Sequence, residues 1–214
     1  MSTDPTAFLY PFIESDERDA GPLLAELAAS ARRKFDESRS LQAATLARCE
    51  RDVQAAADAI AARLDAGGSV HAFGNGGSAT DAEAAAHRFR RLGVAAQNLA
   101  ADPAILTALA NDVGFDLVFS RQLIAHGDAG DVAIAFSTSG GSANVVEALI
   151  TARRLGLLTV AIVGYDGGLV AERGLADHCL VVESSSVHRI QECQDGLLRS
   201  LVDLVGCART GGQS

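Results

Sequence analysis

The feature that most constrains the fold of this 214-residue chain is a regular alternation of short apolar runs with helical segments from residue 69 onward. Apolar runs of this kind are typical of parallel strands that are buried on both faces, with helices as the crossovers between them. We therefore expect an α/β fold with one parallel sheet. Its strands are expected at SVHAFG (69–74), VAAQNLA (94–100), DVAIAFS (131–137), LLTVAIVG (157–164) and HCLVVES (178–184).

The first 65 residues have a different pattern. Residues 1–20 have weak periodicity, so we expect an N-terminal arm there. Helical patterns follow at about 22–38 and 41–64, and Gly67 and Gly68 end the second of them. No internal repeat or linker interrupts the rest, which predicts a single domain over 21–214 with an N-terminal helical hairpin. The longer helix has one apolar face, and this face packs either on its own domain or on another copy.

Charge and apolar content exclude several partners. Lys and Arg total 18 and Asp and Glu total 27, which gives a net charge of −9. This balance argues against direct binding of nucleic acid or of an anionic membrane surface. No apolar run is long enough to span a bilayer, and the N-terminus lacks a basic signal region. Four cysteines without C-x-x-C spacing are typical of reduced thiols, so we expect a cytoplasmic protein.

Two loops that follow strands carry the pattern of a phosphate site. GNGGS (74–78) lets backbone N–H groups approach an oxyanion closely, although a tight turn or a dinucleotide loop fits it as well. Ser78 is expected to cap the helix that follows. STSGGSAN (137–144) adds four hydroxyl groups at the start of another helix. Two such loops on neighbouring strands predict a small phosphorylated ligand between them, because ligands of parallel sheets bind at the carboxyl ends of the strands.

These motifs, together with NDVGFDLVFSRQL, VGYDGG and RIQE, resemble the sugar isomerase (SIS) domain family in order and spacing, over about residues 24–206. The match is closest to the phosphoheptose isomerase branch. The resemblance implies a three-layer, flavodoxin-like sandwich with N-terminal helices, a homotetramer, and a phosphosugar site at a subunit interface. It implies phosphate contacts from Ser137, Thr138, Ser139 and Ser142, and sugar contacts from Asn75, Gly76, Ser78, Asp112 and Gln191.

The chain departs from the family where the family keeps its chemistry. Active members carry a histidine and a glutamate three and seven residues beyond the aspartate of the first motif, and a histidine eight residues beyond the glutamine of RIQE. Here those positions hold Ala84, Arg88 and Arg199. Many members also bind zinc through these side chains, of which only Gln191 is present, so we expect no metal and no other cofactor. An always-charged guanidinium is a poor general base.

These departures favour a phosphosugar-binding protein without the standard isomerase acid–base pair, and a role with a protein partner stays open. Arg88 and Arg199 are expected either to contact a second anion or to face solvent and acidic neighbours. The main alternative is an aldose–ketose isomerase acting on sedoheptulose 7-phosphate or a related sugar with rearranged residues. Two helical i, i+4 pairs are candidates for such a set, Glu83 with His87 and His188 with Glu192. A nucleotide binder is a third, weaker interpretation.

Overall fold

The computed structural model describes residues 21–211, so the arm expected at 1–20 lies outside the described residues. The chain divides into two compact units, 1–37 and 38–214. The second unit holds the sheet and both hydrophobic cores. The domain boundary expected at residue 21 stays a prediction.

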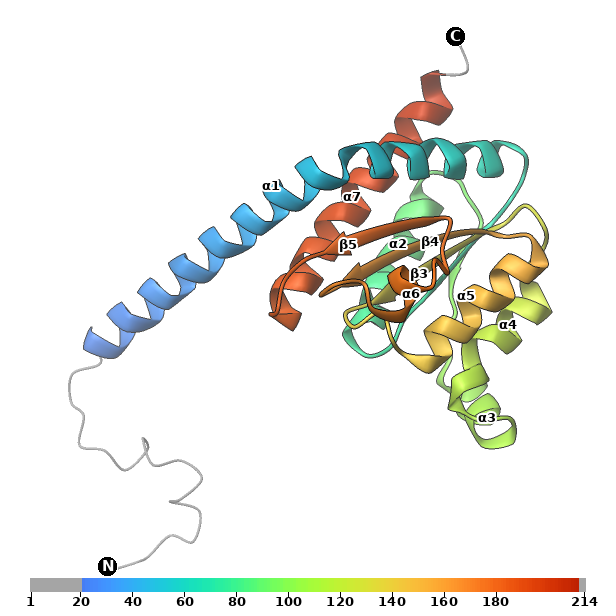
Figure 1. Cartoon of the computed structure of the whole chain (residues 1–214), viewed down its shortest axis with the longest axis horizontal. Coiled ribbons are helices and arrows are strands. Elements are labelled where there is room, and N and C mark those ends of the chain that lie inside the picture. Colours follow the sequence, from blue (N-terminus) through green and yellow to red (C-terminus); the bar gives the residue numbers. More distant parts are fainter. Residues whose placement is uncertain (1–20, 212–214) are drawn as a thin grey trace, which may run out of the picture. The chain divides into compact units, whose positions relative to one another are not determined.

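Five parallel strands form one sheet in the order β2-β1-β3-β4-β5 (Figure 1). This is the strand order of flavodoxin-like folds, and the predicted fold class is confirmed. Each strand lies within the apolar run that predicted it. Their bounds are β1 Val70–Phe73, β2 Ala96–Asn98, β3 Val132–Ser137, β4 Leu158–Gly164 and β5 His178–Val182.

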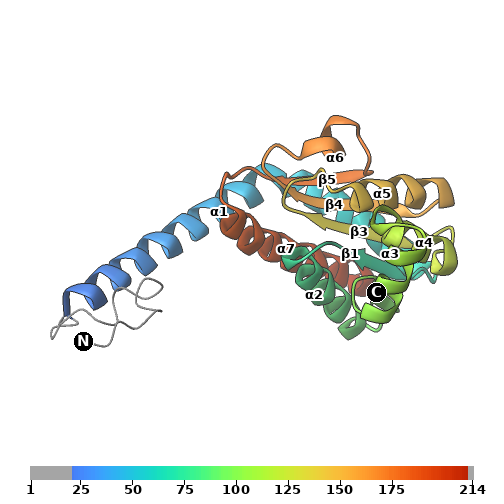
Figure 2. The same ribbon diagram turned by 90° about the horizontal axis from the view of Figure 1, so that it is seen from below.

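Helices cover both faces of the sheet because alternate strand residues point to opposite faces. On β3, for example, Ile134 belongs to a core shared with α1, α2 and α7, and Ala135 to a core shared with α4 and α5. Figure 2 shows α2 and α7 on one side of the sheet and α4 and α5 on the other. The helices are α1 Gly21–Asp65, α2 Gly77–Arg91, α3 Pro103–Asp112, α4 Val118–His126, α5 Ala143–Leu155, α6 Gly168–Glu172 and α7 Val187–Gly211, with a 3₁₀ turn η1 at Phe115–Leu117.

The expected N-terminal helical hairpin is wrong. One continuous helix, α1, replaces the two helices predicted at 22–38 and 41–64. The physical reason is visible in the sequence, because no glycine or proline occurs between residues 22 and 67 to end the first helix. The predicted break rested only on a change in periodicity near residue 38.

A polar network fixes the amino-terminal edge of the sheet. His71 is buried, and its Nε2 lies 2.9 Å from Asp131 Oδ2, while Gln97 Nε2 lies 2.7 Å from His71 Nδ1. Burial disfavours the charge on Asp131, but N–H groups of Asp128 and Ser69 and the His71 ring outweigh it and lower the pKa of that carboxyl. This network joins β1 and β2 to the loop before β3.

In the part of the chain that the structure describes, no helix has the length and apolar character that a membrane-spanning helix needs.

Candidate functional site

The two glycine- and serine-rich loops lie next to each other, because β1 and β3 are parallel neighbours and both end at the same edge of the sheet. In the first loop, α2 begins at Gly77 with Gly76 as its N-cap. The expectation that Ser78 caps this helix is therefore wrong. Ser78 instead lies inside the first turn, where its N–H donates to Asn75 O and its side chain is buried.

The second loop keeps its hydroxyl protons available. Ser137 Oγ accepts a hydrogen bond from the Gly140 N–H at 3.1 Å, and Ser139 Oγ accepts one from the Gly141 N–H at 3.2 Å. A hydroxyl that accepts in this way can still donate its proton to an oxyanion. Ser142 is the N-cap of α5, as expected, but its side chain does not bond the first turn. The arrangement suits an anion in front of the helix N-terminus.

The VGYDGG segment (163–168) packs against this second loop. Gly140 has φ +60° and accepts a hydrogen bond from the Val170 N–H, and a Cβ at this position would clash with the carbonyl oxygen of Gly167. Only glycine fits there, since the position requires both a left-handed backbone and a close approach. Tyr165, at φ +53°, is the one non-glycine residue with positive φ among those that the structure describes.

The side chains of the two loops also meet directly. Asn75 Nδ2 donates to Asn144 Oδ1 at 2.8 Å, and Asn144 Nδ2 donates to Asn75 Oδ1 at 2.8 Å. Asn144 is the second residue of α5 and is buried, with 2% of its surface exposed. The expected sugar contact Asn75 is thereby fixed to the helix whose N-terminus faces the expected phosphate position.

A cavity of about 770 Å³ adjoins the second loop at the ends of β4 and β5. Sequence reasoning missed the residues that it adds. The serine run after HCLVV was the available signal, because β5 ends at the same edge of the sheet as β3. Glu183, on the cavity wall, lies 3.4 Å from Arg48 Nη1. The cavity is lined by Ser139, Tyr165, Asp166, Glu183, Ser184 and Ser185.

Helices α2 and α7 face each other beside the first loop. The Gln191 amide lies against Gly77, where a Cβ would clash with it. Further along the same faces, Asp195 binds both Arg88 and Arg199. Arg88 Nη2 lies 3.0 Å from Asp195 Oδ1, and Arg199 bonds Oδ2 through Nε at 2.9 Å and Nη2 at 2.7 Å. The two guanidinium groups thus share one acidic partner.

Asp81 lies on the same face of α2 as Arg88, and its carboxyl group has an unusual environment. Its Oδ2 is buried and has no hydrogen-bond partner among the described residues. Burial, followed by the negative charge of Asp195, raises the pKa of Asp81 from 3.8 to about 6, and Arg88 opposes the shift only in part. The group titrates close to neutrality, which is the range in which a carboxyl can take up and release a proton.

We expect Asp81→Asn to stabilise the fold at pH 7.5. Because the pKa of Asp81 is higher in the fold than in the unfolded chain, the ionised carboxylate destabilises the fold above pH 6, and this penalty disappears as the pH falls toward 4. The full shift corresponds to about 3 kcal/mol, and solvent screening reduces it to about 1–2 kcal/mol. Urea unfolding at pH 7.5 and pH 4 measures the difference.

The exposed Glu83→Gln on the same helix is the matched control and should change stability by less than about 0.5 kcal/mol. A lower stability of Asp81→Asn at pH 7.5, or an equal gain at pH 4, contradicts this assignment.

The rival histidine–glutamate pairs lie on exposed faces of their helices. Glu83 and His87 are exposed on α2, and Glu83 Oε1 lies 2.8 Å from Arg90 Nη2 in an ion pair. His188 and Glu192 are likewise exposed on α7. No hydrogen bond or ion pair between the described residues joins either pair to Asp81 or Asp195, and Glu192 is bound instead to Arg189.

The zinc set of the family does not fit here. Ala84 carries no ligand atom, and the guanidinium groups of Arg88 and Arg199 are cations held by Asp195. Gln191 alone is a weak basis for a metal site. Within residues 21–211, no group of three or more histidine, cysteine, aspartate or glutamate side chains is placed to hold a metal ion.

Asp112 is not joined to the other expected sugar contacts. It ends α3, is exposed, and accepts a hydrogen bond from Asn111 Nδ2 at 2.9 Å. No hydrogen bond between described residues connects it to the loops at 74–78 or 137–142. Its expected contact with the sugar stays a prediction.

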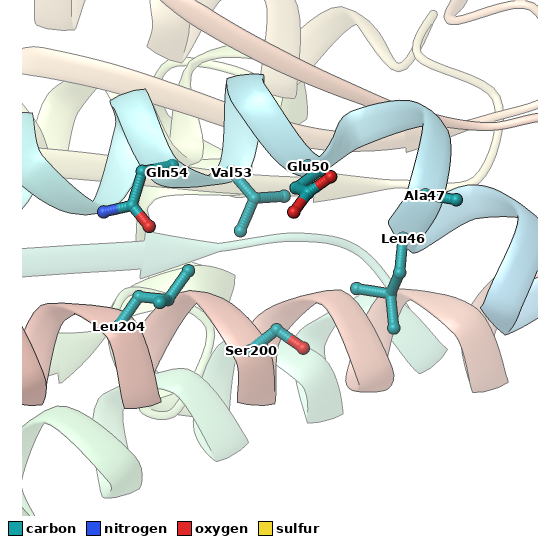
Figure 3. A pocket seen from close by; sticks show the side chains of 7 residues that line it. All are labelled: Leu46, Ala47, Glu50, Val53, Gln54, Ser200 and Leu204. Carbon is teal, nitrogen blue, oxygen red and sulfur yellow. The ribbon is translucent and has the colours of Figure 1, made fainter.

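A second concave feature is a groove of about 400 Å³ between α1 and α7 (Figure 3). Figure 3 shows Leu46 and Val53 pointing from α1 toward α7, and Leu204 pointing back toward α1. The groove is mainly apolar and lies on the helical layer, away from the loops at the carboxyl edge. Its lining residues are Leu46, Ala47, Glu50, Val53, Gln54, Ser200 and Leu204.

Comparison with known proteins identifies the family of this chain. The family model described as the SIS domain matches residues 35–164, which is more than half of the chain. The chain belongs to the SIS-domain family. The family resemblance seen in the sequence motifs is thereby confirmed.

Its relatives within the SIS-domain family include curated phosphoheptose isomerases. The chain is 44% identical over 162 residues to the one from Paramagnetospirillum magneticum, covering 73% of this chain and 81% of the relative. It is 46% identical over 171 residues to the one from Chlorobaculum parvum, covering 75% and 81%. The solved phosphoheptose isomerase GmhA from Neisseria gonorrhoeae superposes with a TM-score of 0.80 at 35% identity, covering 86% of this chain and 99% of that one.

Proposed function

We propose that this SIS-domain protein binds a phosphorylated sugar. The phosphate is assigned to Ser137, Thr138, Ser139 and Ser142, and the sugar to Asn75, Gly76, Ser78, Asp112 and Gln191. The observation that carries the proposal is the direct amide pairing of Asn75 with Asn144, which holds the two loops together at the carboxyl edge of the sheet. The phosphoheptose isomerases among its relatives support the same class of ligand.

The test of this site is Ser139→Ala. The Ser139 hydroxyl is exposed and free to donate to a phosphate oxygen, so its loss should weaken binding of sedoheptulose 7-phosphate by about 1–3 kcal/mol. This corresponds to a roughly 5- to 150-fold higher dissociation constant in calorimetry. Thr210→Ala, which removes an exposed hydroxyl that bonds only to carbonyls of its own helix α7, is the matched control and should bind as the unmodified chain does. Unchanged affinity of Ser139→Ala rules out this phosphate position.

We further propose that the chain does not use the standard acid–base pair of the family. The pairing of Arg88 and Arg199 with Asp195 supports this, because two cations bound to a carboxylate neither accept a proton nor hold zinc. No metal or other cofactor is proposed. The additional anion contacts expected of these arginines stay a prediction, and an anion there has to displace Asp195 or share the guanidinium groups with it.

A sugar-phosphate isomerase with rearranged residues is the second candidate function. One observation favours it, namely the buried, unpartnered oxygen of Asp81, whose carboxyl titrates near pH 6. Asp81 follows the first loop by one helical turn and lies on the face of α2 that is packed on α7. In this candidate Asp81 replaces the exposed Glu83, His87 and His188 as the group that moves the proton.

We also propose a cytoplasmic homotetramer, in which the α1–α7 groove receives a second copy. The apolar lining of the groove supports this. So do Leu23, Leu24 and Leu27, which are more than half exposed on the first turns of α1. A protein partner other than a second copy stays a prediction from the sequence.

The oligomeric state is directly measurable. Four copies of a 22.1-kDa chain give about 88 kDa by light scattering at micromolar concentration. Leu204→Arg places a charge in the groove and is expected to shift the protein toward smaller species, whereas Arg63→Ala on α1 is expected to leave the mass unchanged. A single species of one-chain mass for the unmodified protein excludes the tetramer.

A further inference from the structure

The reciprocal hydrogen bonds between Asn75 and Asn144 connect residues that are 69 positions apart in the sequence. Asn75 is half-buried and lies in the first loop, whereas Asn144 is buried behind the second loop. A side chain as enclosed as that of Asn144 does not reach a ligand in the cavity or in the loops. Any effect of this side chain on a ligand therefore passes through Asn75.

The pairing leaves one N–H donor and one acceptor lone pair of the Asn75 side chain free, and it fixes the directions in which they point. A carboxamide offers two N–H donors and two acceptor lone pairs. The two bonds with Asn144 use one donor and one lone pair of Asn75, so one donor and one lone pair are left. Because two bonds hold the amide plane, the remaining donor and acceptor cannot rotate away. This is the arrangement that a neutral hydroxyl group, which both donates and accepts, matches best.

The loops that the pair joins are also packed tightly. A Cβ at Gly74 would lie 2.8 Å from Phe136 O on β3, so the first loop rests directly on the strand that leads into the second. The backbone contact fixes the distance between the loops, and the amide pair fixes the orientation of the Asn75 side chain within that contact.

We propose that Asn144 is a positioning residue, which holds Asn75 in the orientation that binds a sugar hydroxyl when the phosphate occupies the Ser137–Ser142 loop. The inference rests on the proposed phosphosugar function and adds a residue to it. Asn144 itself does not contact the sugar. Its replacement removes the orientation of Asn75 while the backbone and hydroxyl groups around the phosphate stay in place.

The two parts of the ligand respond differently to Asn144→Ala. Freeing one side chain that has to be immobilised again on binding costs about 3- to 10-fold in affinity. We therefore expect sedoheptulose 7-phosphate to bind about 3- to 10-fold more weakly in calorimetry. Inorganic phosphate, which does not need Asn75, should bind within twofold of the unmodified chain.

A double-mutant cycle and a buried control separate positioning from general destabilisation. If Asn144 acts only through Asn75, the double variant Asn75→Ala with Asn144→Ala binds the sugar phosphate no more weakly than Asn75→Ala alone. Gln122→Ala is the matched control, because Gln122 is also a buried amide with two hydrogen bonds, to Leu99 O and Val118 O, but it lies on α4. It should leave both affinities unchanged.

The possible results distinguish a failure of the positioning role of Asn144 from a failure of the proposed phosphosugar binding. Equal losses for inorganic phosphate and sugar phosphate in Asn144→Ala, additive losses in the cycle, or the same loss in Gln122→Ala overturn the positioning role and leave the phosphosugar site intact. Failure of the unmodified chain to bind either ligand overturns the proposed function and the positioning role together.

Discussion

Isomerisation of sedoheptulose 7-phosphate by the unmodified chain is expected to be slower than that of a SIS-domain relative with the full acid–base pair by about 10⁴-fold or more. A positioned general acid or base contributes about 10²–10⁴-fold each, and the two positions that the family resemblance assigns to this pair hold Arg88 and Arg199. Asp195 binds the two guanidinium groups in ion pairs, and a guanidinium is a poor general base. Isomer interconversion by NMR and incorporation of deuterium from heavy water, with and without added zinc, measure the rate.

The matched variant restores the family set through Arg88→Glu, Arg199→His and Ala84→His. In the structure this change leaves Asp195 without its cations and close to two other carboxylates, Asp81 and the new one at 88. We therefore expect the three substitutions to recover less activity than the same three combined with Asp195→Asn. The added neutral residue removes the like-charge repulsion that would raise the pKa of the new base.

Rapid deuterium incorporation by the unmodified chain contradicts the binding-protein interpretation and favours the second candidate function. Asp81→Asn then decides the role of Asp81. Loss of the exchange, together with loss of a pH-dependent step near pH 6, assigns the proton transfer to that carboxyl. Persistence of the exchange in Asp81→Asn excludes it.

The strands and their parallel arrangement follow from the sequence because each is an apolar run buried on both faces. β3 and β4 are buried at every position, so their continuous apolar sequences are enough to predict buried strands. β2 is weaker, with three half-buried residues, and it is shorter than the run that predicted it. Short α6 and the helix α4 were not predicted, since neither has the length or the caps that mark a helix in a sequence.

In the candidate site, too, the local motifs were predictable from the sequence, whereas the contacts between distant elements were not. The loops at 74–78 and 137–144 are local motifs and were visible. The i, i+4 spacing of Asp195 and Arg199 is also local, but it was missed. The contact of Arg88 with Asp195 depends on how α2 and α7 are rotated against each other, which no local pattern specifies. The Asn75–Asn144 pair depends on strand order, because only adjacent β1 and β3 bring the two loops together.

Asp131→Ala is expected to lower the free energy of unfolding by about 3–5 kcal/mol at pH 7, the largest stability effect that we foresee for one side chain. The substitution removes the buried partner of His71, and it leaves the N–H groups of Ser69 and Asp128 without their acceptor. A buried donor that is left without its acceptor costs about 1–3 kcal/mol, and this substitution affects three of them. Urea unfolding followed by circular dichroism measures the change.

The pH dependence gives the same network a second, independent test. Because the pKa of Asp131 is lower in the fold than in the unfolded chain, its carboxylate stabilises the fold above about pH 4, and this contribution is lost as the pH falls through the folded pKa. The stability gap between the unmodified chain and Asp131→Ala should therefore narrow when unfolding is measured below pH 4. Asp128→Ala, which removes an exposed carboxylate three residues away, is the control and should change stability by less than about 0.5 kcal/mol. A gap that stays constant with pH would mean that the packing of Asp131, rather than its charge, holds the edge of the sheet together.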